Sequence, residues 1–138
     1  MKKLALYILI LTSLIVQSCN KDDNYIPDVP VTINIPANDY RISALTSGGG
    51  AITISGGVAG IILYKKSSGQ IVAYDRCSSF NPESKCAVNI TSPSTIATDP
   101  CSGSIFNLED GSSIHAPATR PLKQYLVTVT SSQITVIN

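Results

Sequence analysis

Histidine is almost absent from this sequence, which contains a single one, His115, in 138 residues. Tryptophan is missing, and charged residues make up only 14% of the chain. One histidine excludes any site within one chain that needs two imidazole ligands, and the low charge leaves no basic stripe for nucleic acid. No nucleophile lies at a recognisable spacing from His115, and no Gly-Xaa-Ser-Xaa-Gly elbow is present. The sequence therefore favours a protein without catalytic activity.

The N-terminal 19 residues resemble a bacterial lipoprotein signal. Lys2 and Lys3 precede an apolar run over 4–16, which is too short to span a bilayer as a stable helix. The following Val16-Gln17-Ser18-Cys19 resembles a lipobox. This resemblance implies that residues 1–18 are a signal peptide and that Cys19 carries acyl chains, such as palmitate, which anchor the protein in a membrane.

Residues 19–29 are expected to form a lipidated, flexible tether ahead of a domain that covers 30–138. Asn20-Lys21-Asp22-Asp23-Asn24 looks like the lysine-acidic export signal that places lipoproteins on the outer face of the Bacteroidetes outer membrane. Pro27 and Pro30 favour an extended linker after it. The expected location is the outer membrane, either at the cell surface or on the periplasmic face.

Short runs of strand-forming residues dominate the rest of the chain. Residues 31–35 alternate apolar and polar side chains, as a half-buried strand does, whereas 60–65 is mostly apolar and is expected to be buried on both faces near its start. No window after the signal peptide has helical periodicity. We expect an all-β domain of nine or ten short strands. The candidates are 31–35, 40–45 (the weakest), 51–54, 60–65, 70–74, 87–90, 95–98, 104–108, 113–115, 124–130 and 133–137.

Two cysteine-bearing loops and a proline loop lie between these runs. Tyr74-Asp75-Arg76-Cys77-Ser78-Ser79-Phe80 begins the first, Asp99-Pro100-Cys101-Ser102-Gly103-Ser104 forms the second, and Ala116-Pro117-Ala118 lies in the third. With Pro-Leu-Xaa-Xaa-Tyr over 121–125, this order resembles a Rieske-type [2Fe–2S] domain, in particular the divergent Rieske-like lipoproteins of Bacteroidetes. The resemblance covers roughly 30–138. It implies an antiparallel β-sandwich or barrel that carries the three loops.

The second cysteine loop aligns with the family's cluster-binding box without gaps. A Rieske cluster has one iron held by two cysteines and one held by two histidines. The family's second box reads Cys-Pro-Cys-His-Gly-Ser, so Asp99 stands where a ligand cysteine is expected and Ser102 where a ligand histidine is expected. Oxygen donors thus replace softer ligands at both positions.

The first cysteine loop allows two registers against the family's Cys-Xaa-His box. One register puts Ser78 and Phe80 on the ligand positions, and a shift of one residue puts Cys77 and Ser79 there. At least three of the four ligands are replaced in either register. We expect no cluster and no metal. The alternative is a [2Fe–2S] electron-transfer protein or oxidoreductase component that uses atypical or partner-supplied ligands.

The resemblance also implies a disulfide, because Cys101 falls on a non-ligand cysteine that the family uses for a bridge between the two loops. Cys86 is the preferred partner and Cys77 is the rival. An oxidising envelope would allow such a bridge to persist. A zinc site of three cysteines with His115 is disfavoured, because the wide spacings lack a paired-ligand signature. The sequence thus predicts a membrane-anchored structural or interaction module with an unidentified protein partner.

Overall fold

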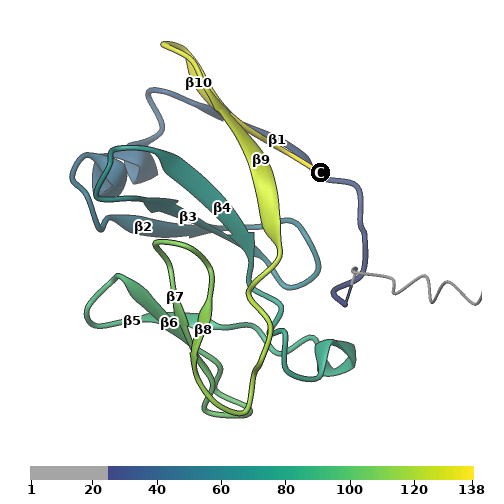
Figure 1. The fold of residues 1–138 in the computed structure, drawn as a ribbon. Helices are drawn as coiled ribbons and strands as arrows, with labels where there is room; N and C mark the ends of the chain where they lie inside the picture. Colours follow the sequence, from purple (N-terminus) through teal and green to yellow (C-terminus); the bar gives the residue numbers. More distant parts are fainter. Residues whose placement is uncertain (1–24) are drawn as a thin grey trace, which may run out of the picture.

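The computed structural model describes residues 25–138, so the signal peptide, the lipobox cysteine and the export signal predicted above lie outside the described residues. Ten strands and two short 3-10 helices make up this part of the chain (Figure 1). They are β1 (Thr32–Pro36), η1 (Tyr40–Leu45), β2 (Ala51–Ile54), β3 (Ile61–Lys65), β4 (Ile71–Asp75), η2 (Pro82–Ser84), β5 (Asn89–Thr91), β6 (Ile96–Thr98), β7 (Ile105–Asn107), β8 (Ser113–His115), β9 (Gln124–Val129) and β10 (Gln133–Ile137).

The strands form two antiparallel sheets. The larger sheet has the order β1-β10-β9-β4-β3-β2, and the smaller one has the order β5-β6-β7-β8. Figure 1 shows the smaller sheet beneath the larger one. Because β4 pairs directly with β9, through Ala73 opposite Tyr125, residues 76–123 form an excursion that leaves the large sheet and returns to it. This excursion contains both cysteine loops and the proline loop, and the fold is the all-β arrangement that the sequence predicts.

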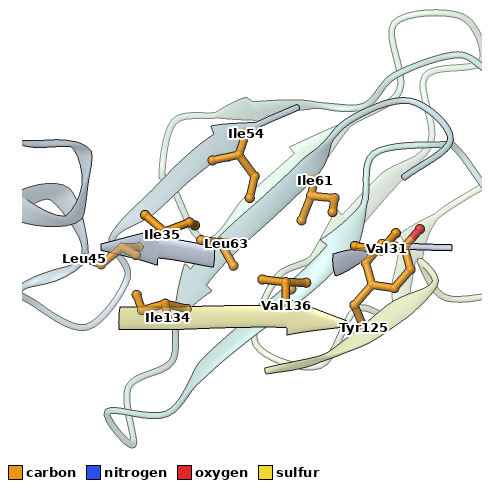
Figure 2. Packing of buried hydrophobic residues seen from close by; sticks show 10 residues of the cluster. Val31, Ile35, Leu45, Ile54, Ile61, Leu63, Tyr125, Ile134 and Val136 are labelled. Carbon is orange, nitrogen blue, oxygen red and sulfur yellow. The ribbon is translucent and has the colours of Figure 1, made fainter. Parts of the chain in front are cut away.

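Strand β3 lies between two hydrophobic cores, which explains why its first four residues, 61–64, are apolar or aromatic. Successive side chains of a strand point to opposite faces. Ile61 and Leu63 therefore enter the core enclosed by the large sheet, together with Tyr125 and Val136 (Figure 2). Ile62 and Tyr64 enter a second core, which includes Phe106 and Leu108 from the excursion. The two-sided burial expected for 60–65 is confirmed, since residues 61–64 have no exposed surface.

The strand predicted at 40–45 is wrong, because Tyr40–Leu45 is the 3-10 helix η1. Its cap is the side chain of Asp39, which accepts a hydrogen bond from the Arg41 amide at 2.9 Å and forms an ion pair with the Arg41 guanidinium at 2.7 Å. A capping carboxylate satisfies an amide that has no partner within a short helix, which favours the turn over an extended strand. Leu45 is the buried residue of η1.

The last five residues of the predicted tether pack against the domain. Ile26 is only 1% exposed, and Asp28 forms an ion pair with Lys123 at 2.7 Å. The Tyr25 hydroxyl donates a hydrogen bond to the carbonyl of Pro121, and the guanidinium of Arg120 lies 5.0 Å from the centre of the Tyr25 ring. We call residues 25–29 the strap. In residues 25–138, no helix has the length and apolar character needed to cross a membrane.

Candidate functional site: a serine-aspartate network between three loops

The two cysteine loops are held in shape by their own backbone. The first loop leaves β4 and folds back on itself, with a β-bridge between Cys77 and Ala87 and a 2.9 Å hydrogen bond from the Ser78 amide to the Cys86 carbonyl. The second loop turns tightly between β6 and β7, where the Gly103 amide donates to the Asp99 carbonyl at 2.9 Å. Gly103 has a φ of +79°, which glycine adopts without the steric cost that a side chain would add.

Asp99 lies at the centre of the site and has no exposed surface. One carboxylate oxygen accepts hydrogen bonds from the hydroxyls of Ser78, at 2.6 Å, and Ser102, at 2.5 Å. The other oxygen accepts from the Cys101 amide at 2.8 Å. Burial by itself would raise the pKa of Asp99, but the hydrogen bonds from Ser102, Ser78 and the Cys101 amide outweigh it and lower this pKa from 3.8. The carboxylate is therefore ionised at neutral pH and fully hydrogen-bonded.

The network continues from Asp99 into all three loops. The hydroxyls of Ser102 and Ser104 are 2.8 Å apart, and Ser104 in turn accepts a hydrogen bond from the Ala118 amide of the proline loop at 2.9 Å. On the opposite side, the Ser78 hydroxyl accepts from the Phe80 amide at 3.2 Å. A continuous chain of hydrogen bonds thus joins the two cysteine loops to the proline loop.

A disulfide between Cys86 and Cys101 also joins the two cysteine loops. Their Cα atoms lie 6.4 Å apart, within the range that disulfides span. The remaining cysteine of the described residues, Cys77, is a free thiol without exposed surface. Burial, followed by the nearby Asp75 carboxylate, raises the pKa of the Cys77 thiol to about 11. A protonated, inaccessible thiol fits the interpretation of Cys77 as a structural leftover rather than a redox-active group.

The contacts separate the residues that the two registers of the first loop assign to ligand positions. Ser78 is buried and contacts Asp99, which also contacts Ser102, so three ligand positions of the first register meet in one network. Phe80, the fourth, offers no donor atom and is 41% exposed. Cys77 points elsewhere, with its sulfur 3.5 Å from the Pro82 carbonyl. Ser79 also lies outside the network and donates instead to the Arg120 carbonyl at 2.5 Å.

These donors do not fit a [2Fe–2S] cluster of the Rieske type. Such a cluster needs two thiolates and two imidazoles, whereas this site offers two hydroxyls, one carboxylate and a phenyl ring. The oxygen donors already satisfy one another by hydrogen bonds. Cys86, Asp99 and Cys101 have potential ligand atoms within 4.8 Å of one another, but the two sulfurs are bonded to each other and therefore offer no thiolate. His115 is exposed on β8 and does not belong to this group.

Two buried contacts of the domain escaped the sequence analysis. The sequence predicts only that Asp75 is a turn carboxylate that accepts hydrogen bonds at a strand end, without identifying its distant partners. In the fold its carboxylate accepts hydrogen bonds from the amides of Val58 and Cys77, at 2.6 and 2.7 Å, and from the Tyr125 hydroxyl at 2.6 Å. Ser104 was read only as part of the motif, yet it connects to the proline loop. No sequence signal marks the contacts of Asp75 with Val58 and Tyr125 or of Ser104 with Ala118, because these partners lie far apart along the chain.

The fold of the domain is that of Rieske proteins and Rieske-type ferredoxins. The plasma membrane Rieske protein of the cyanobacterium Synechocystis PCC 6803 matches with a TM-score of 0.56 at 23% identity, over 79% of this chain and 98% of that chain. A chain from the complex of reduced oxygenase and oxidised ferredoxin of carbazole 1,9a-dioxygenase matches with a TM-score of 0.52 at 19% identity, over 78% and 93%. The ferredoxin of Sphingomonas yanoikuyae B1 gives 0.52 at 15%, over 78% and 99%.

Sequence comparisons add nothing to this result, because no protein-family model and no curated protein sequence matches the chain. Similarity to solved structures at such low identity defines the fold alone. The Rieske-like architecture that the sequence motifs implied is therefore confirmed, with its two cysteine loops and its proline loop in place. The chemistry has to be argued from the residues of this chain.

Proposed function

We propose that this protein is a lipid-anchored envelope protein whose Rieske-type domain works without an iron–sulfur cluster, as a non-catalytic structural or interaction module. The observation that carries the proposal is the network around Asp99. It occupies three of the four ligand positions and leaves no thiolate or imidazole among them.

The network and the disulfide link the two cysteine loops, as a cluster would. A cluster cross-links two loops through covalent metal–ligand bonds. Here Asp99 links Ser78 of the first loop to Ser102 of the second, and the disulfide between Cys86 and Cys101 adds a covalent link between the same loops. Closing a loop of 15 residues is worth about 3 kcal/mol in the chain-entropy model. The three loops therefore keep a defined surface without metal.

The lipid anchor is the second part of the proposal, and it rests on the lipobox that ends at Cys19. Five residues lie between Cys19 and Tyr25, where the docked strap begins, so the linker comprises six residue-to-residue steps. An extended chain covers at most about 3.3–3.6 Å per residue, so this linker would reach about 20 Å. An acylated Cys19 would then keep the strap, and the proline loop that Tyr25 contacts, close to the membrane surface. The partner would approach a domain held in a restricted orientation.

The decisive experiment on the cluster is anaerobic purification of the full chain, followed by measurement of iron, acid-labile sulfide and visible absorption. We expect no stoichiometric iron and no reducible chromophore. A reduced sample with the electron paramagnetic resonance signal of a [2Fe–2S] centre would refute the proposal. The matched gain-of-function control is the variant S78C/F80H/D99C/S102H, which restores the family's ligands in the first register. Iron binding by this variant alone would assign the loss of the cluster to these four positions.

The anchor is tested separately by cell fractionation. We expect Cys19→Ala to move the protein from the membrane fraction to the soluble fraction, and Cys77→Ala to leave it at the membrane. Retention of the Cys19→Ala variant in the membrane would refute lipidation at this residue. Digestion of intact cells with a protease then distinguishes a location at the cell surface from one on the periplasmic face, because only a surface-exposed protein is cleaved.

A further inference from the structure

A cavity of about 500 Å³ opens on the large sheet, away from the serine-aspartate network. It is lined by residues 53–60, at the end of β2 and in the loop that follows, and by the side chains of Arg41 and Arg76. This volume lies within the range of small-molecule pockets. The lining contains two cations and no carboxylate, and most of its surface is polar. Such a lining is unsuited to an apolar ligand and favours a small anion.

Arg76 is a fixed cation without an anionic partner. Its Nε donates to the Val88 carbonyl at 2.9 Å, and one terminal nitrogen donates to the Asn89 side chain at 2.8 Å. Both acceptors are neutral, and Arg76 takes part in none of the ion pairs of residues 25–138. Its other terminal nitrogen, Nη1, lies beside Gly60 of the cavity lining. The guanidinium is thus held in place, with a spare donor and an uncompensated charge at the cavity.

Arg41 approaches the same cavity with one edge of its guanidinium occupied. Its Nε and Nη2 donate hydrogen bonds to the carboxylate of Asp39, which leaves Nη1 without a hydrogen-bond partner among residues 25–138. The ion pair neutralises much of the Arg41 charge but also orients its planar group. A planar guanidinium with free donors is suited to the oxygens of phosphate groups. Arg76 should therefore contribute more to binding than Arg41.

The loop over residues 55–60, which lines the cavity together with the two arginines, is held by hydrogen bonds to a buried side chain. A loop that is already held in place lowers the entropic cost of binding a ligand. The buried carboxylate of Asp75 accepts hydrogen bonds from the amides of Val58 and Ala59, at 2.6 and 3.3 Å. Gly57 has a φ of +62° and passes so close to Asp75 and Tyr125 that a side chain there would clash. Because Asp75 already uses these two amides, neither is left to donate to a ligand.

We propose that this cavity binds an oxyanion of the phosphate type between Arg41 and Arg76. The ligand is either a free phosphate-bearing molecule or the headgroup of an anionic lipid, since both present the same oxygens. The inference does not rest on the absence of a cluster, because no residue of the cavity lining belongs to the serine-aspartate network.

The test is isothermal titration calorimetry of the full chain in detergent, with inorganic phosphate as the probe. We expect saturable binding that Arg76→Gln weakens about tenfold or more, the loss expected for a charge-assisted hydrogen bond. Ser55→Glu places a carboxylate on the exposed rim of the cavity without removing any hydrogen bond of the structure, and it should weaken binding by a similar factor with an unchanged melting temperature. Lys85→Gln removes an exposed positive charge elsewhere and should bind as the natural protein does.

A second experiment distinguishes a lipid headgroup from a free phosphate-bearing molecule as the ligand. The Cys19→Ala chain is floated with vesicles of phosphatidylcholine, with and without phosphatidate, and again after adding Ser55→Glu. Phosphatidate-dependent flotation that Ser55→Glu abolishes assigns the site to a lipid headgroup, whereas phosphate binding without flotation assigns it to a free molecule. The proposal is overturned if neither probe binds, if Ser55→Glu has no effect, or if Lys85→Gln weakens binding as much as Ser55→Glu does.

Discussion

Replacing Asp99 by asparagine tests whether the serine-aspartate network stabilises the domain. The substitution keeps the size of the side chain but removes the charge and one acceptor oxygen. In the natural protein, the hydroxyls of Ser78 and Ser102 both donate to the same carboxylate oxygen, at 2.6 and 2.5 Å. Asparagine can keep its carbonyl toward the Cys101 amide, and the two hydroxyls must then turn to accept from a neutral amide.

The expected loss follows from the change in hydrogen-bond type. A hydrogen bond to a charged group contributes about 1.5–3 kcal/mol and a neutral one about 0.5–1.5 kcal/mol, so two bonds lose about 2 kcal/mol together. The lower cost of burying a neutral amide offsets part of this loss. At about 4 °C per kcal/mol for a domain of this size, Asp99→Asn should melt about 8 °C below the natural protein at pH 7.

The same variant predicts a pH dependence whose sign is fixed by the lowered pKa of Asp99. A carboxyl group whose pKa is lower in the folded state than in the unfolded state stabilises the fold fully above the unfolded pKa, about 3.9. That contribution is lost as the pH falls through the folded pKa, which lies below 3.8. The difference in unfolding free energy between the natural protein and Asp99→Asn should therefore stay constant from neutral pH to about pH 5 and shrink towards pH 2.

Urea unfolding followed by circular dichroism, with the disulfide intact, measures this difference at each pH. Asp110→Asn is the matched control, because Asp110 also accepts two hydrogen bonds, from the amide and hydroxyl of Ser112, but is exposed. Its effect should be less than half that of Asp99→Asn. Equal stability of Asp99→Asn and the natural protein at pH 7, or a difference that does not change with pH, would refute the reasoning.

Three further predictions concern the cysteines and the other buried carboxylate. Peptide mapping without reduction should show Cys86 joined to Cys101, and replacing both by serine should cost about 3 kcal/mol of unfolding free energy in urea titrations; a bridge that contains Cys77 would contradict the structure. Because burial raises the pKa of Cys77 to about 11, iodoacetamide at pH 8 should leave it unmodified in the folded protein and alkylate it in urea, so rapid native labelling would show that the thiol is accessible. Tyr125→Phe removes a 2.6 Å hydrogen bond to the buried Asp75 and should cost about 2 kcal/mol by urea unfolding; an unchanged midpoint would mean that this contact does not stabilise the fold.

Strand positions could be predicted from local sequence, because the pattern of apolar and polar residues in a strand reflects which of its faces are buried. The continuous apolar run of β3 indicated burial on both faces, and the alternation near residue 31 indicated the half-buried edge strand β1. The strand prediction for 40–45 failed, because this segment is the 3-10 helix η1. The side chain of Asp39, one residue upstream, caps a turn there instead.

For the candidate site, too, some features could be predicted from the sequence and others could not. The motif order alone implied the loops, the fold and the preference for a bridge between Cys86 and Cys101. It left two registers for the first loop, because a shift of one residue costs nothing in a sequence comparison. The structure shows that, among Cys77, Ser78 and Ser79, only Ser78 donates a hydrogen bond to Asp99.

The amino-acid sequence by itself determined which chemistry this chain lacks, since one histidine and four cysteines are a matter of composition. It also determined the β-rich pattern through local periodicity. Only the tertiary structure decided what replaces the missing ligands, and that Arg41 and Arg76 line one cavity. The decisive contacts join distant residues, such as Ser78 with Asp99, and they depend on distances and angles that the folded sheets alone establish.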